Sequence, residues 1–182
     1  MPPEGRSVDA LTDALAAATP RLDARTRPLA RALYGCLARG RPVTDGTLAA
    51  ETASTADAVR ATLDEWSGVF RDDDDAVVGF WGLSLTPTTH TLTVDGIRLF
   101  AWCAWDTLFL PALLDRPAFV RSRCPVTGAE VRLTIEPARI REHDPEALLV
   151  SFPPATAVTS ADVTGSFCCP GLPATVLPLP TT

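Results

Sequence analysis

Apolar residues recur at helical spacing in the first third of the chain. In the segment 8–18 they fall at i, i+4 and i+7, which places them on one face of a helix. The segment 27–39 repeats this spacing, and Gly40 and Pro42 are typical of a helix end. Two shorter helices are predicted next, over 45–52 with Thr44 as the N-cap, and from Ser54 or Thr55 to about Trp66.

Three or four short helices joined by tight turns suggest a helical winged-helix-like module, which we expect over residues 1–75. The last of these helices occupies the position of a DNA-recognition helix. Its charged side chains are net negative, whereas DNA binding needs a cationic face. A helical module that packs on a second domain is therefore the better interpretation. These charged residues are Asp57, Arg60, Asp64 and Glu65.

Beyond residue 75 the pattern changes to short β-rich segments, after an acidic run at 72–75 that is typical of a solvated turn. Asp95-Gly96 is a strong hairpin signal, and a second hairpin is expected around 125–128. The apolar segment 102–114 has the length of a helix, although Pro111 predicts a kink or a split in it. The predicted strands are 76–79, 83–86, 90–94, 97–101, 120–123, 130–135 and 148–152.

These elements predict an α+β fold with two parts. The helical module over 1–75 would be followed, over 76–182, by a mixed domain of antiparallel sheets with a catalytic helix. The proline-rich tail from Cys169 onward is expected to wrap around this domain without regular structure.

Composition narrows the possible functions. The net charge is −6, and an acidic chain is a poor ligand for nucleic acid. No stretch reaches the roughly 18 apolar residues of a membrane span. The first residues lack a basic start followed by an apolar run, so we expect no signal peptide, no membrane association and a location in the cytoplasm.

The chain has five cysteines, an odd number that argues against a disulfide framework. Cys36 lies on the apolar face of a predicted helix and is expected in the core, whereas Cys124 at a hairpin turn is expected to be structural. The adjacent Cys168 and Cys169 lack the spacing of a zinc site. Thiolates without histidine or carboxylate helpers favour soft metals, although core packing would explain this pair as well.

Cys103 and Asp106 form the clearest candidate for chemistry. The two residues are three positions apart. If they lie at the start of a helix, their side chains share one face of it, with Cβ atoms about 5–6 Å apart. The helix N-terminus would stabilise a thiolate, and aromatic neighbours would raise the pKa of the carboxyl group. By spacing alone, a buried cysteine beside a helix-capping aspartate would look the same.

Three blocks resemble the signature of the bacterial alkylmercury lyases. The first is the run 99–114, which contains Cys103 and Asp106. The second comprises Cys124, 127–129 and 131–134, and the third is Ser166-Phe-Cys-Cys169. They occur in the order and spacing of that family, and with the helical module they cover nearly the whole chain.

The resemblance implies a catalytic trio of Cys103, Asp106 and Cys168. Two thiolates would hold the mercury of an organomercurial substrate, and Asp106 would protonate its carbon. The product Hg(II) would remain bound to Cys103 and Cys168, and Asp106 could contact it as well. Cellular thiols or a mercuric reductase would then remove it. No organic cofactor is implied, and Cys169 matches a neighbour that is not essential.

An apolar pocket for the organic group would complete such a site. The candidate pocket aromatics are Phe80, Trp81, Trp102, Trp105, Phe109 and Phe167.

The sequence departs from the family pattern at one place. The family continues well beyond the Cys-Cys pair, whereas this sequence ends at Thr182, so a shortened C-terminus is expected.

Two alternative functions remain: a non-catalytic thiol-based mercury binder, and a mercury-sensing regulator. The presence of Asp106 favours the lyase over the binder, and the acidic fourth helix disfavours the regulator.

Overall fold

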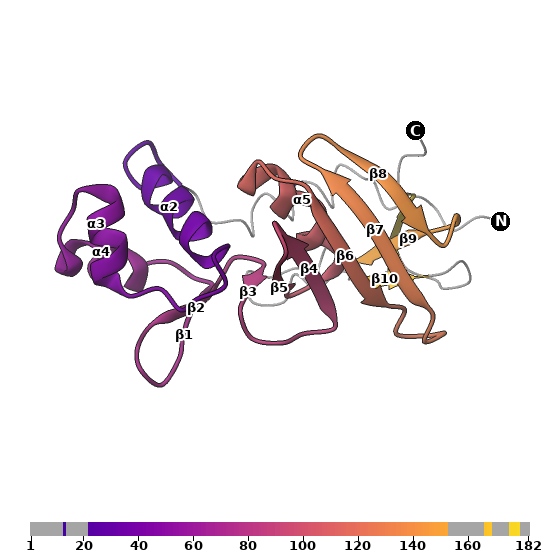
Figure 1. The fold of residues 1–182 in the computed structure, drawn as a ribbon, viewed down its shortest axis with the longest axis horizontal. Coiled ribbons are helices and arrows are strands. Elements are labelled where there is room, and N and C mark those ends of the chain that lie inside the picture. The colour runs from indigo at the N-terminus through magenta and orange to yellow at the C-terminus, as the bar shows by residue number, and fades with distance from the viewer. Residues whose placement is uncertain (1–12, 14–21, 153–165, 169–174, 179–182) are drawn as a thin grey trace.

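A computed structural model describes residue 13 and residues 22–152, 166–168 and 175–178 of the chain. The first described helices gather at one end of the molecule beside the first strands of the sheet, the later strands extend toward the other end, and one further helix lies over the sheet (Figure 1). The helix predicted over 8–18 lies outside the described residues apart from Asp13. The helices are α2 (Arg27–Leu37), α3 (Asp45–Thr52), α4 (Ala56–Asp64) and α5 (Ala104–Leu114).

The helical module has the ends that the sequence predicts. Thr44 and Thr55 cap α3 and α4, each accepting a hydrogen bond from the backbone N–H three residues on, at 3.2 Å in both cases. The turn after α2 passes through Gly40 at φ +73°, a left-handed conformation that suits glycine. The predicted helices over 27–39, 45–52 and 54–66 are thereby confirmed within one to two residues at most ends.

An eight-stranded antiparallel sheet forms the centre of the molecule, in the order β1-β2-β3-β5-β4-β6-β7-β8. A second sheet of three strands has the order β10-β9-β11. Both predicted hairpins are confirmed, and Asp95 and Gly96 turn with φ of 49° and 77°. The strands are β1 (Val69–Arg71), β2 (Val77–Phe80), β3 (Leu83–Ser84), β4 (His90–Val94), β5 (Ile97–Ala101), β6 (Ala118–Arg123), β7 (Glu130–Glu136), β8 (Arg139–Asp144), β9 (Leu149–Phe152), β10 (Ser166–Cys168) and β11 (Thr175–Pro178).

Four of these strands were not predicted. β1 has only three residues and pairs with β2, whereas β8 is rich in charged residues and pairs with β7. β10 and β11 pair with the two sides of β9. The expectation of a tail without regular structure is therefore wrong at β11, where backbone pairing with β9 overrides the proline-rich composition.

Helix α5 lies over the large sheet and contacts β4, β5, β6 and β7 on one side and α2 on the other. It continues through Pro111 as one helix, so the predicted split does not occur. Pro111 stands near the C-terminal end, where its missing N–H removes a single intrahelical hydrogen bond. The core between these layers includes Leu33, Leu37, Phe80, Leu99 and Leu110, each at most 1% exposed.

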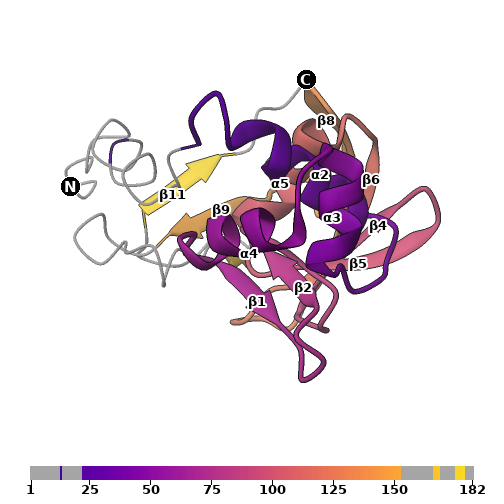
Figure 2. The same ribbon diagram turned by 90° about the vertical axis from the view of Figure 1, so that its left-hand side faces the viewer.

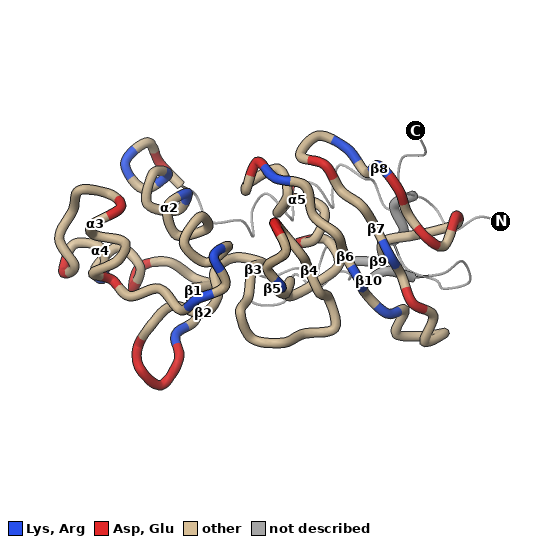
Figure 3. Tube along the Cα trace, in the orientation of Figure 1, with Lys and Arg blue, Asp and Glu red and all other residues tan. Residues whose placement is uncertain are grey.

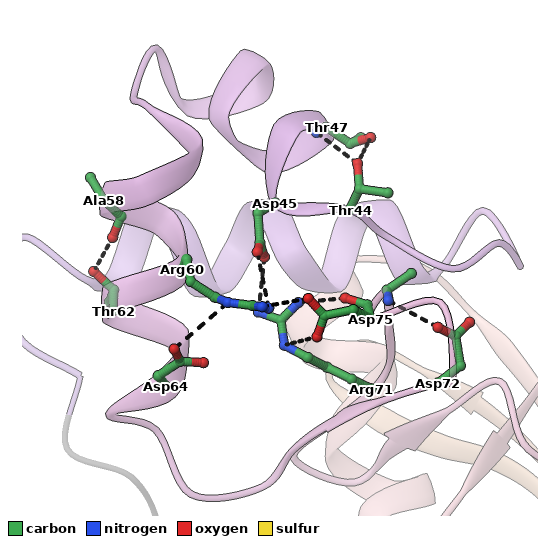
Figure 4. Close-up of polar contacts among 11 residues, drawn as sticks. Thr44, Asp45, Thr47, Ala58, Arg60, Thr62, Asp64, Arg71, Asp72 and Asp75 are labelled. Carbon is green, nitrogen blue, oxygen red and sulfur yellow. Dashed lines mark hydrogen bonds and ion pairs between the residues drawn. The ribbon is translucent and has the colours of Figure 1, made fainter.

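Charged side chains tie the helical module to the first hairpin of the sheet (Figure 4). Asp45 at the start of α3 accepts a hydrogen bond from Arg71 of β1 at 2.9 Å and lies 3.4 Å from Arg60 of α4. Arg60 also pairs with Asp75 in the acidic β1–β2 turn. This turn is the red loop of Figure 3. The acidic run therefore forms a solvent-exposed turn, as the sequence predicts.

Among the residues that the structure describes, no helix combines the length and the apolar character needed to cross a bilayer.

Candidate active site

The candidate site lies at the N-terminus of α5, where Cys103 is the N-cap residue and Asp106 is at the third helical position. Cys103 has extended backbone angles (φ −142°, ψ 173°), which turn its side chain back over the first turn of the helix. The Cys103 N–H donates to Asp106 Oδ2 at 2.7 Å, and the Cys103 side chain accepts from the Asp106 N–H. This reciprocal capping box brings thiol and carboxylate together, as the sequence predicts.

Both groups are withdrawn from water. Cys103 is 1% exposed and Asp106 is 6% exposed. Burial raises the pKa of Asp106 to about 6, against the opposing effect of the hydrogen bonds from the Cys103 side chain and backbone. The carboxyl group can therefore both accept and release a proton near neutral pH.

The wall on the other side of Asp106 is the turn between β2 and β3. Gly82 has a φ of +84°, and a Cβ added there would lie 2.7 Å from Asp106 Cγ. The Gly82 carbonyl accepts a hydrogen bond from the Trp102 N–H at 3.0 Å, which fixes the turn beside the start of α5. Glycine is thus required both for the backbone angle and for the space that Asp106 occupies.

Tyr34 reaches the same place from helix α2. Its hydroxyl donates to the Trp81 carbonyl at 2.9 Å, and the ring packs on Phe80 with centroids 4.9 Å apart. Burial and the nearby Asp106 carboxylate raise the pKa of Tyr34 above its usual range. Sequence reasoning missed Tyr34 and Gly82. A glycine between two short strands indicated only a turn, and nothing local connects Tyr34 with a residue so far along the chain.

Among the predicted pocket aromatics, Phe80 is buried, whereas the others with described side chains are partly buried. Phe80 is 1% exposed and stacks on Trp66 with centroids 5.3 Å apart, so it serves the core. Trp102, directly before Cys103, meets the exposed ring of Phe70 edge-on at 4.9 Å. Trp81 donates from its indole nitrogen to the Ser67 carbonyl at 3.1 Å. Trp105 and Phe109 lie on α5 with ring centroids 6.4 Å apart, and the Phe167 side chain is outside the described part.

Strand β10, which contains Cys168, contacts helix α5. Cys168 pairs with Leu149 of β9. This pairing says nothing about the Cys168 side chain, and the membership of Cys168 in the site stays a prediction. Cys169 lies outside the described residues.

The remaining cysteines and histidines lie in structural positions. Cys36 is buried on α2, and Cys124 is buried at the β6–β7 turn, where its sulfur accepts from the Thr127 N–H at 3.5 Å. His90 bonds Ser122 through Nδ1 at 2.7 Å. Burial lowers the pKa of His90 to about 4. No group of three or more His, Cys, Asp or Glu side chains suited to a metal ion occurs within the described ranges.

Fold and site together define an α+β protein with a helical module and a buried thiol–carboxylate pair at a helix N-terminus. The family model for alkylmercury lyase matches residues 83–173, and the model for the helix-turn-helix domain of alkylmercury lyase matches residues 8–81. The chain therefore belongs to the alkylmercury lyase family. Its predicted α+β fold with a winged-helix-like module is confirmed.

Sequence identity to named relatives supports the same family assignment. The chain is 42% identical over 140 residues to the alkylmercury lyase of Staphylococcus epidermidis, covering 77% of this chain and 63% of that protein. It is 42% identical over 146 residues to the enzyme of the same name from Streptomyces lividans, covering 80% and 66%. The chain thus spans less than two thirds of the length of these relatives.

A solved structure shares the fold. The crystal structure of the mercury-bound form of MerB2 superposes with a TM-score of 0.73, covering 93% of this chain and 92% of that chain. The sequence identity in this comparison is 23%, so the match is evidence for the fold alone.

Proposed function

We propose that this protein is an organomercurial lyase, which cleaves the carbon–mercury bond by protonolysis to a hydrocarbon and Hg(II) in mercury detoxification. The observation that carries the proposal is the buried capping box that joins the Cys103 thiol to the Asp106 carboxyl group. Membership of the alkylmercury lyase family supports it. The reaction takes its two sulfur ligands and its proton from side chains, so it requires no organic cofactor.

The proposed reaction begins with capture of the substrate R–Hg–X by Cys103. The thiol sulfur replaces X on mercury, and the thiol proton leaves with X. The Cys168 thiol then gives its proton to the Asp106 carboxylate, and the resulting thiolate becomes the second sulfur ligand of mercury. The Hg–C bond is now electron-rich, since soft thiolates donate strongly to a soft metal.

Asp106 completes the reaction. Its proton moves to the carbon while the electron pair of the Hg–C bond forms the new C–H bond. R–H leaves, and Hg(II) stays between the sulfurs of Cys103 and Cys168. The pKa of about 6 supports this role, because the same group must take a proton and return it near neutral pH.

Several further expectations belong to this proposal. The substrate is an organomercurial small molecule, and the product Hg(II) passes to cellular thiols or a mercuric reductase. The protein would act in the cytoplasm, without nucleic acid or membrane. The division into a helical module over 1–75 and a catalytic part over 76–182 stays a prediction.

The test is incubation with methylmercury or phenylmercury and excess thiol, while methane or benzene is measured. Release should be absent in Cys103→Ala and in Asp106→Ala, and strongly reduced in Cys168→Ala. Cys36→Ala removes a buried thiol from α2 and is the matched control, for which release should continue. Stoichiometric mercury binding by the wild-type protein without any hydrocarbon would contradict the lyase and support a non-catalytic mercury binder.

A further inference from the structure

Helix α2 of the helical module contributes one polar contact to the neighbourhood of Asp106. Tyr34 is 7% exposed, and its hydroxyl donates to the carbonyl of Trp81, 47 residues further along the chain, at 2.9 Å. The ring lies on Phe80, so the position of the hydroxyl is fixed by packing as well as by the hydrogen bond.

The turn that receives this hydrogen bond has an unusual backbone. Trp81 has a φ of 29° and Gly82 a φ of 84°, so two consecutive residues lie in the left-handed region. Such a conformation costs free energy for the tryptophan and persists only where surrounding contacts hold it. The Trp81 N–H donates to the Gly68 carbonyl at 3.1 Å, and the Gly82 carbonyl accepts from Trp102 at 3.0 Å.

The turn lies directly against the Asp106 side chain. The space where a Gly82 Cβ would stand is 2.8 Å from Asp106 Oδ1 and 2.9 Å from Asp106 Cβ. A displacement of this turn away from α5 would therefore open room for Asp106 to rotate away from Cys103.

We propose that Tyr34 is a positioning residue whose hydroxyl holds the Trp81–Gly82 turn against Asp106, so that the carboxyl group stays aligned with Cys103. The catalytic part of this inference rests on the proposed lyase function. The helical module would thereby act on the reaction through one side chain of α2, without touching substrate.

The test uses Tyr34→Phe, which keeps the ring on Phe80 and removes only the hydroxyl. Amide hydrogen exchange at Trp102 and Cys103, expressed relative to the amides of strand β6, reports the turn and the capping box without any need for turnover. We expect exchange at both amides to rise at least severalfold. Unchanged exchange at both would overturn the inference, whether or not the protein is a lyase.

Kinetics test the catalytic part. For Tyr34→Phe we expect kcat for benzene release from phenylmercury to fall on the order of tenfold with KM unchanged, since misalignment affects the proton transfers through Asp106 and leaves the initial capture by Cys103 intact. Leu33→Ala is the control, because it opens a cavity in the same helix and keeps the hydroxyl; its kcat should stay near the wild-type value.

Different results would refute the lyase proposal and the positioning role of Tyr34. A wild-type protein that releases no benzene would refute the lyase proposal and leave the exchange result to decide the coupling. Wild-type release with an unchanged kcat in Tyr34→Phe would overturn the positioning role and leave the lyase intact. An equal loss of kcat in Leu33→Ala would assign the effect to general destabilisation and would also overturn it.

Discussion

At the scale of single residues, Asp106 has two roles in one position. It caps α5 through the Cys103 N–H, and it lies in a site where burial opposes its charge. The sequence predicted a desolvated acid beside a thiol, and it equally allowed a simple helix cap. The structure contains both, because a capping box is what holds the carboxyl group beside the sulfur.

The raised pKa of Asp106 predicts a stability effect with a definite sign. Because the folded-state pKa of about 6 exceeds the unfolded value near 3.8, ionisation opposes folding. The penalty is absent below about pH 4, grows between pH 4 and 6, and reaches about 3 kcal/mol above that range. Asp106→Asn keeps an oxygen that can cap Cys103, so it should gain this amount over the wild type between pH 4 and 7.

The measurement is denaturant unfolding of both proteins across that pH range. His90 titrates in the opposite sense, since its lowered pKa of about 4 removes stability as pH falls below about 6.5. Its contribution is common to both proteins and cancels in the difference. A stability difference that does not change with pH would contradict a raised pKa at Asp106.

Gly82 offers a second prediction at this scale. Gly82→Ala places a Cβ 2.7 Å from Asp106 Cγ and should reduce hydrocarbon release on the order of a hundredfold. Gly96→Ala is the matched control, because φ there is +77° and no atom lies within 4 Å of the added Cβ. Both variants carry similar backbone strain, so equal rates in the two would show that contact with Asp106 does not matter.

At the scale of elements, the sequence predicted what local patterns determine. Caps at Thr44 and Thr55 and the Asp95-Gly96 turn are set by neighbouring residues, and these elements are confirmed. Strands β1 and β8 are edge strands whose pairing with β2 and β7 contains a register shift, and strands β10 and β11 both pair with β9. A single sequence carries little signal for such pairing. The Tyr34–Trp81 contact is missed for the same reason.

The ion pairs between α3 and β1 predict an effect on stability. Arg71 and Asp45 meet at 2.9 Å with side chains only 16% and 17% exposed. Arg71→Ala should lower the free energy of unfolding by about 1–2 kcal/mol, because Asp45 is left half-buried without this partner. Thermal unfolding monitored by circular dichroism measures it.

Arg39→Ala breaks a pair with Glu51 whose side chains are 61% and 40% exposed, and it should change stability little. Equal losses in Arg39→Ala and Arg71→Ala would contradict the importance of the half-buried pair. Neither variant touches the site, so hydrocarbon release per folded molecule should match the wild type in both.

At the scale of the whole molecule, two segments far away in sequence lie beside the start of α5. They are the turn at Trp81-Gly82, which lies against Asp106, and helix α2, whose Tyr34 bonds to that turn. Strand β10 also contacts α5. In the turned view of Figure 2, α2 and α5 overlap, and residues of the two helices are in contact. Spacing in the sequence could pair Cys103 with Asp106, whereas the grouping with Cys168 came from the resemblance and stays a prediction.

The central claim is that Cys103 and Asp106 together break a carbon–mercury bond with a proton from Asp106. The most direct measurement is a single turnover in D₂O, with protein in excess over phenylmercury and mass spectrometry of both products. The wild type should release benzene carrying one deuterium and keep one Hg(II) per substrate consumed. Asp106→Asn should hold phenylmercury with its phenyl group still attached, whereas benzene release at the wild-type rate from that variant would contradict the claim.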